Sequence, residues 1–226
     1  MEIEAVPRHA ELIQEQMGVT SGGGITTAGT PQEEAASEEA AVPLVGKDAT
    51  MFRGVAARCN YLSLDRPDLQ YAAKEVCSEM SSPNSQSVTK LRGIAQLLYG
   101  KPRLIWMSVY QDQVKCLDIC VDANWAACKR SRKSTSGGDA MPGQHCLKTR
   151  AKTQATIAKS SAESEFYGII RGSTEGLGLI ALGADFGMLL QVQVHVDASA
   201  AIGIVGRQGL QHIRHIEVDM LWLQEM

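Results

Sequence analysis

Long hydrophobic runs and an excess of charge of one sign are both missing from this chain of 226 residues. No apolar run approaches the roughly 20 residues that a membrane-spanning helix needs, and no signal-peptide pattern opens the chain. The formal net charge of −3 provides no overall attraction to nucleic acid, so any such contact must come from a local basic patch. We therefore expect an intracellular protein, cytoplasmic or nuclear, with no membrane partner.

Cysteine pairs of the kind that bind zinc are missing as well. None of the six cysteines forms a Cys-x-x-Cys pair, and the closest spacing, Cys116 to Cys120, has no matching His or Cys pair downstream. This scatter favours reduced, structural thiols over metal ligands or disulfides.

What the sequence does contain changes in character along its length. Residues 1–18 include a short helix that Gly18 stops, and residues 19–47 are rich in Gly, Thr, Ala and Glu, which predicts a disordered linker. Residues 48–103 carry apolar side chains at helical spacing, which predicts a small helical connection segment. Its helices are expected at about 49–63, from Arg66 to Met80, and at 86–99.

Residues 104–226 predict a mixed α/β domain. Strands are expected at 104–110 and 114–125, as two short strands within about 138–159, and at 191–197. In the second of these strands Leu117, Ile119 and Val121 alternate on one face, which puts Asp122 on the opposite face.

Helices are expected around the last of these strands. One begins at SSAESEFYGII, where Ser160 and Glu163 have the spacing of a capping box. A second begins just after Asp197, and the C-terminal residues 212–226 predict a third. The helical stripe of the first consists of Phe166, Ile169, Ile170 and Leu177.

Three acidic residues fall where they can converge. Asp122 and Asp197 each lie at the carboxyl end of a predicted strand, and ligands of open α/β sheets gather outside those ends. Glu165 lies in the first turn of the helix between them, where the helix dipole favours a carboxylate. Convergent carboxylates repel one another unless a cation neutralises them, and Mg²⁺ or Mn²⁺ prefers such oxygen ligands. Two such ions, roughly 4 Å apart, are a standard device for hydrolysing phosphodiesters.

A basic stretch closely follows the first of these acids and is suited to contact phosphates. Its members are Lys129, Arg130, Arg132 and Lys133. Taken singly, each feature has an ordinary explanation: an Asp after a strand is commonly a turn residue, a Glu in a first turn commonly caps a helix, and a basic stretch is commonly a solvated loop. Their joint placement favours a metal site, although composition alone leaves both interpretations open.

Four segments carry motifs in the order of one known family. They are YLSLDRPDLQYAAKEVCSEMSSP (61–83), CVDANWAACKRSRKSTSGG (120–138), AKTQATIAKSSAESEFYGI (151–169) and HVDASAAIGIV (195–205). They resemble the C-terminal part of the Pol polyprotein of copia-type LTR retrotransposons, where the first segment joins the reverse transcriptase to its RNase H. Two further segments, RHAELIQEQMGV (8–19) and RQGLQHIRHIEVDMLWLQE (207–225), are also similar to this family, so the resemblance spans about residues 8–226.

The resemblance implies an RNase H-like fold, a mixed sheet with flanking helices, that cleaves the RNA strand of RNA–DNA hybrids. Catalytic and metal-binding roles carry over to Asp122, Glu165 and Asp197, with Mg²⁺ or Mn²⁺ as cofactor. The implied partners are an RNA–DNA hybrid and the remainder of the Pol polyprotein, in a virus-like particle in the intact family. The alternative is a catalytically inactive remnant that at most binds nucleic acid or Pol partners.

The chain also departs from the family pattern. The polymerase signature Tyr-x-Asp-Asp is absent, so this chain is not a reverse transcriptase by itself. Asn124 stands where the family often has a second Asp, and Thr149 replaces a common Trp. In the family a further strand follows, and then a helix with a fourth metal-binding Asp, whereas this chain ends at Met226. We therefore expect the RNase H-like domain, residues 104–226, to be incomplete.

Overall fold

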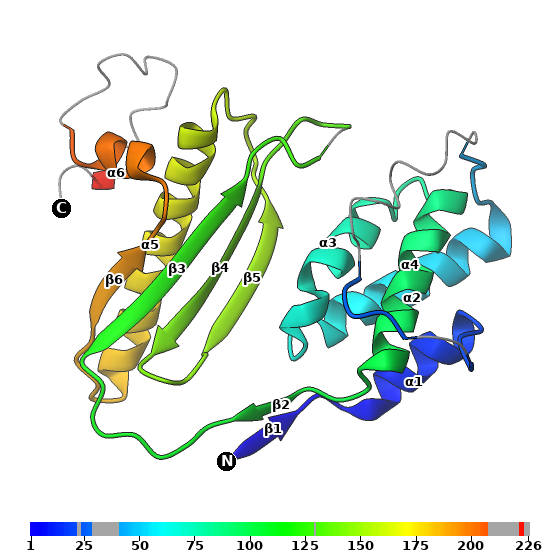
Figure 1. Cartoon of the computed structure of the whole chain (residues 1–226), viewed down its shortest axis with the longest axis horizontal. Coiled ribbons are helices and arrows are strands. Elements are labelled where there is room, and N and C mark those ends of the chain that lie inside the picture. Colours follow the sequence, from blue (N-terminus) through cyan, green and yellow to red (C-terminus); the bar gives the residue numbers. More distant parts are fainter. Residues whose placement is uncertain (22–23, 29–40, 129, 208–221, 224–226) are drawn as a thin grey trace. The chain divides into compact units, whose positions relative to one another are not determined.

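A computed structural model describes residues 1–21, 24–28, 41–128, 130–207 and 222–223 of the chain (Figure 1). The chain divides into two compact units, Met1–Ser108 and Val109–Met226. Each unit has its own apolar core, so each is described by itself. In the described part of the chain, no helix is long and apolar enough to cross a membrane.

The first unit is mainly helical. Its elements are β1 (Glu2–Glu4), α1 (Pro7–Gln16), α2 (Gly46–Leu62), the 3₁₀ turn η1 (Pro67–Leu69), α3 (Gln70–Ser78), α4 (Ser85–Gly100) and β2 (Ile105–Met107). The N-terminal helix α1 packs on α2 and α4, and its Ile13 is fully buried in the common core. Of the predicted linker, residues 22–23 and 29–40 lie outside the described residues, whereas Val19 and Ala28 are buried in this core.

The strand expected at 104–110 is shorter and has a different partner from the one predicted. Only Ile105–Met107 is a strand, and it pairs antiparallel with β1, with Glu2 opposite Met107. It therefore belongs to the first unit instead of opening the α/β domain, because an N-terminal strand distant in the sequence satisfies its backbone hydrogen bonds.

The Arg-Pro-Asp segment of the family motif has a structural role in this unit. Arg66 is almost fully buried, and its guanidinium donates to both carboxylate oxygens of Asp68, at 2.9 and 2.8 Å. It also donates to the carbonyl oxygens of Lys101 and Pro102, at 2.9 and 3.2 Å. A buried charge is tolerated only when it is paired and hydrogen-bonded, so Arg66 ties η1 to the chain that follows α4.

The second unit is a four-stranded mixed sheet with a long helix on one face (Figure 1). Its elements are β3 (Cys116–Asn124), β4 (Thr135–Pro142), β5 (Lys148–Thr153), α5 (Ser161–Asp185), β6 (Gln191–His195) and α6 (Ser199–Val205). The strand order is β5-β4-β3-β6, with β3 antiparallel to β4 and parallel to β6. This confirms the predicted mixed α/β class. The helix predicted at 212–226 lies outside the described residues, apart from positions 222–223.

Side-chain alternation in β3 follows the prediction. Leu117 and Ile119 are fully buried and Val121 is buried, whereas Cys120 and Asp122 are exposed on the other face. The buried face packs against α5, and this contact forms the core of the second unit.

The contact face of α5 differs from the predicted stripe. Phe166 and Ile169 are buried as expected, but Leu177 is exposed, so its assignment to the stripe was wrong. The face continues instead through glycines: a Cβ on Gly172 would lie 2.6 Å from Cγ1 of Val121, and one on Gly176 would lie 2.8 Å from a methyl group of β6. Because these positions carry no side chain, α5 lies close to the sheet.

Candidate metal centre

The register of the two parallel strands brings Asp122 and Asp197 to the same level. Cys120 of β3 is paired with His195 of β6, and this is the last pair of the ladder. Asp122 lies two residues beyond Cys120, and Asp197 lies two residues beyond His195, each toward the carboxyl end of its strand. The two aspartates are therefore neighbours near the carboxyl ends of their strands, where the sequence predicted that two acids could converge.

Helix α5 brings Glu165 to the same place. The helix begins after Ser160, whose Oγ accepts a hydrogen bond from the N–H of Glu163 at 3.2 Å. The carboxylate of Glu163 accepts from the N–H of Lys159 at 2.8 Å, not from that of Ser160, so only half of the predicted capping box forms. Glu165 is the fifth residue of the helix, so it lies at the start of the second turn and not in the first as predicted.

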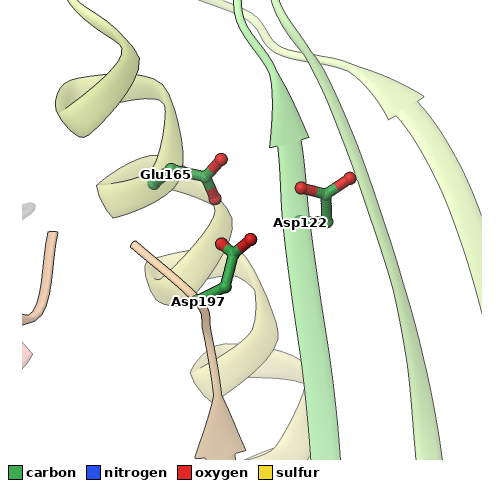
Figure 2. A group of neighbouring side chains, drawn as sticks. All are labelled: Asp122, Glu165 and Asp197. Carbon is green, nitrogen blue, oxygen red and sulfur yellow. The ribbon is translucent and has the colours of Figure 1, made fainter. Parts of the chain in front are cut away.

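The three acids converge, and we call Asp122, Glu165 and Asp197 the acidic cluster. One carboxylate oxygen from each lies within 4.8 Å of the others. Figure 2 shows the three carboxylates facing a common space, one from β3, one from α5 and one from the segment after β6. Both aspartates are exposed, whereas Glu165 is only 5% exposed. The cluster is therefore open to solvent on one side and closed by α5 on the other.

The two oxygens of Glu165 differ in their partners. Oε1 accepts a hydrogen bond from the backbone N–H of Ala123 at 3.2 Å, whereas Oε2 is buried without a hydrogen-bond partner. Burial raises the pKa of Glu165, and the hydrogen bond from Ala123 lowers it in part. The negative charges of Asp122 and Asp197 then raise this pKa further. Among the described residues no Lys, Arg or His forms an ion pair with the cluster.

These features fit a divalent cation. Buried polar atoms are almost always hydrogen-bonded, so the unpaired Oε2 of Glu165 indicates a missing partner. Carboxylate oxygens are the ligands that Mg²⁺ and Mn²⁺ prefer, and a cation held by all three groups relieves their mutual repulsion. The acidic cluster is therefore a candidate site for one of these ions.

Arg130, Arg132 and Lys133 of the predicted basic stretch belong to the loop between β3 and β4, which lies at the end of the sheet where β3 finishes (Figure 1). Arg130 and Arg132 are exposed and Lys133 is partly buried, whereas Lys129 lies outside the described residues. The loop is closed by two backbone hydrogen bonds, from Cys128 to Lys133 at 3.1 Å and from Arg132 to Cys128 at 2.7 Å. The three basic residues that the structure describes thus lie on the loop that follows the strand carrying Asp122.

Three residues around Glu165 were not identified from the sequence. The backbone of Ala123 holds its Oε1, Ser136 of β4 is the register partner of Ala123, and Gln154 links Ser136 to α5. A backbone donor leaves no signature in a sequence. Gln154, by contrast, falls within the AKTQATIAK segment that resembles the family pattern, and this was the available signal.

Fold and cluster together define an α/β protein with a carboxylate site suited to a divalent cation. The chain is 29% identical, over 57% of its length, to the uncharacterized mitochondrial protein AtMg00810 of Arabidopsis thaliana, and spans 53% of it. It is 28% and 27% identical, over 63% of its length, to the retrovirus-related Pol polyproteins from transposons RE1 and RE2 of Arabidopsis thaliana, and spans 10% of each. No protein-family model and no solved structure matches the chain.

These relatives confirm the resemblance found in the sequence motifs. The chain is similar to the retrovirus-related Pol polyproteins from transposons RE1 and RE2 and corresponds to a small part of their length, which supports its interpretation as a Pol fragment. Since no solved structure matches, the RNase H-like fold of the second unit stays a prediction.

Proposed function

We propose that the chain has RNase H-type activity, the metal-dependent endonucleolytic hydrolysis of the RNA strand of an RNA–DNA hybrid. The acidic cluster carries this proposal, because its carboxylates come from β3, α5 and the end of β6 in the chain order Asp, Glu, Asp. Homology to retrovirus-related Pol polyproteins agrees with the role that the motif resemblance implies. The sheet order β5-β4-β3-β6, with α5 crossing between β5 and β6, is the arrangement that we infer to be RNase H-like.

The three residues of the acidic cluster have different roles in the proposed binding of Mg²⁺ or Mn²⁺. Asp122 and Asp197 offer exposed oxygens that a phosphate group approaching from solvent can reach. Glu165 is fixed by the N–H of Ala123 on one oxygen, which leaves its buried Oε2 for the ion. When bound, divalent ions supply the activation of water and the stabilisation of the leaving oxygen.

The basic loop between β3 and β4 is proposed to hold the phosphates of the hybrid. Arg130 and Arg132 are exposed, and Arg132 has a φ of 58°, a left-handed conformation that costs energy in a residue other than glycine. Such strain is common at functional sites, where a side chain has to be presented in one direction. The remainder of the Pol polyprotein is the proposed protein partner.

The test is cleavage of a 5′-labelled RNA strand annealed to DNA, in the presence of Mg²⁺ or Mn²⁺ and after chelation. We expect cleavage only with the divalent ion, and we expect Asp122→Asn to reduce it by more than the roughly 100-fold typical of residues that merely support a metal ligand. Arg132→Gln is expected to raise the KM for the hybrid while leaving kcat close to wild type.

Asp118→Asn is the matched control, because it makes the same chemical change on the same strand, four residues before Asp122 and outside the acidic cluster. This variant is expected to cleave like the wild type. If well-folded wild-type protein cleaves no hybrid under any of these conditions, RNase H activity is excluded and the non-catalytic alternative replaces it.

A further inference from the structure

Gln154 lies directly after β5 and connects three elements through one side-chain amide. Its backbone N–H donates to the carbonyl oxygen of Ser134 at 2.8 Å, which fixes the base of the side chain. Its Nε2 donates to Oγ of Ser136 on β4 and to the carbonyl oxygen of Ser164 in α5, both at 2.8 Å. Both hydrogens of the amide group are thereby used.

Both hydrogen bonds of the Gln154 amide group involve residues that position Glu165. Ser164 precedes Glu165 in α5, so the bond to its carbonyl holds the helix backbone from which the Glu165 side chain projects. Ser136 is the register partner of Ala123, whose N–H donates to Oε1 of Glu165. The side-chain amide of Gln154 thus contacts both the α5 backbone that carries Glu165 and the residue paired with Ala123, which binds the Glu165 carboxylate.

The helix and the sheet also lie close together at this level. A Cβ on Gly168 would lie 3.9 Å from the side chains of both Ala123 and Ser136, within ordinary contact distance. Small residues at these positions therefore set the spacing between α5 and β3, and Gln154 bridges the gap beside them.

Packing alone does not explain a glutamine at position 154. Its Oε1 is buried and has no hydrogen-bond partner, which destabilises the folded state. An apolar side chain of the same length would fill the space without an unpaired oxygen. A buried residue that keeps one polar atom unpaired while its other atoms hold a candidate functional group is a pattern found at functional sites.

We infer that Gln154 is a positioning residue, which holds Glu165 in register with Asp122 and Asp197 through Ser164 and Ser136. Its effect on ion binding rests on the proposed function, whereas its effect on the position of Glu165 does not. Partners that orient metal ligands typically change metal affinity by about 10- to 100-fold when they are removed.

Gln154→Met in the chain of 226 residues tests this inference, because methionine keeps the length of the side chain and removes both donors. In metal-free protein we expect the amide of Ala123 to exchange its hydrogen roughly 10-fold faster than in the wild type, measured by NMR. Calorimetry with Mn²⁺ should show a Kd raised by about 10- to 100-fold. The melting temperature should stay within roughly 2 °C of the wild type.

Gln193→Met is the matched control, since it makes the same change at an exposed glutamine of β6 in the same sheet and should alter none of these quantities. Unchanged exchange at Ala123 in Gln154→Met overturns the inference. So does a large fall in melting temperature with faster exchange along all of β3, because that result assigns Gln154 to packing. If the wild type binds no Mn²⁺, the proposed function fails, while Ala123 exchange still decides the role of Gln154.

Discussion

Strand β3 carries two aspartates on one face, Asp118 near its start and Asp122 near its end. The first lies beside a histidine and the second beside two further acids. Asp118 accepts a hydrogen bond from Nε2 of His195, at 2.7 Å, across the parallel ladder. Four residues later, Asp122 meets two further carboxylates, and no described basic side chain pairs with them. The residue type, strand and face are the same, so the neighbours alone make one position a hydrogen-bonded partner of a histidine and the other part of a candidate cation site.

This difference supports the proposal that the functional site lies at the end of β3 that carries Asp122. A fold selected for stability alone would neutralise a cluster of acids, because like charges held close together favour unfolding. At the end of β3 that carries Asp118, which we call the paired end, the acid has a histidine partner. At the end that carries Asp122, which we call the clustered end, the acids are not neutralised by a described basic side chain, and the buried Glu165 has one unpaired oxygen. Uncompensated acids at one end of the strand support the proposal that the acidic cluster is a functional site.

The largest expected effect is the response of the clustered end to a divalent ion. At a concentration of about 100 times its Kd, Mn²⁺ should stabilise the wild type by about 2.7 kcal/mol, because it binds the folded state. Asp197→Asn should lose most of this stabilisation, while Asp118→Asn should keep it. Thermal unfolding followed by circular dichroism, with and without chelator, measures the difference. Equal responses from the two variants would contradict the distinction between the two ends.

A smaller effect is expected from Glu165→Gln in metal-free protein. The pKa of Glu165 is raised in the folded state, so the folded state binds more protons than the unfolded state between the ordinary value of 4.5 and the raised value. The stability of the wild type therefore falls as the pH rises through this interval, and it stays lower above it. Glutamine cannot ionise, but its amide oxygen can still accept from Ala123.

The variant should consequently melt above the wild type at pH 7, and the difference should shrink as the pH falls from the raised pKa of Glu165 toward 4.5. Melting curves of both proteins at matched pH values give this difference directly, since the other titrating groups cancel. A wild type that is the more stable protein at pH 7 without metal would show that Glu165 is not under electrostatic strain.

The smallest effect is expected at the paired end of β3. Asp118 and His195 are both substantially exposed, and an exposed ion pair contributes about 0–1 kcal/mol to stability. Asp118→Asn should therefore change the free energy of unfolding in urea by less than about 1 kcal/mol. A larger loss would mean that this pair, and not the acidic cluster, dominates the electrostatics of the strand.

Local patterns predicted much of the second unit. The alternation of Leu117, Ile119 and Val121 correctly placed the buried face of β3, because a strand has a period of two whatever surrounds it. The start of α5 was also found, because Ser160 caps its own helix within a few residues. Leu177 was wrongly predicted to lie on the contact face of α5, whereas it is exposed. Glycines form that part of the contact face, and they carry no hydrophobic side chain that a sequence pattern could reveal.

Long-range pairing was harder to predict. The strand Ile105–Met107 was assigned to the α/β domain, but its partner is the strand Glu2–Glu4 at the other end of the first unit. The hydrogen bond from Ala123 to Oε1 of Glu165 likewise joins elements far apart in the sequence. The same is true of the Gln154 side chain, which donates to the carbonyl oxygen of Ser164 in α5. No local pattern records which backbone N–H a side chain will meet.

By itself the sequence determined the elements of the second unit, the identity of the three acids and the kinship with retrotransposon Pol polyproteins. These properties depend on residue type and short-range periodicity. Only the tertiary structure decided that Asp122 and Asp197 stand level across parallel strands, and that Glu165 is buried with one oxygen bound and the other unpaired. The reason is physical: register, burial and hydrogen-bond partners are properties of elements in contact, and contact exists only in the folded chain.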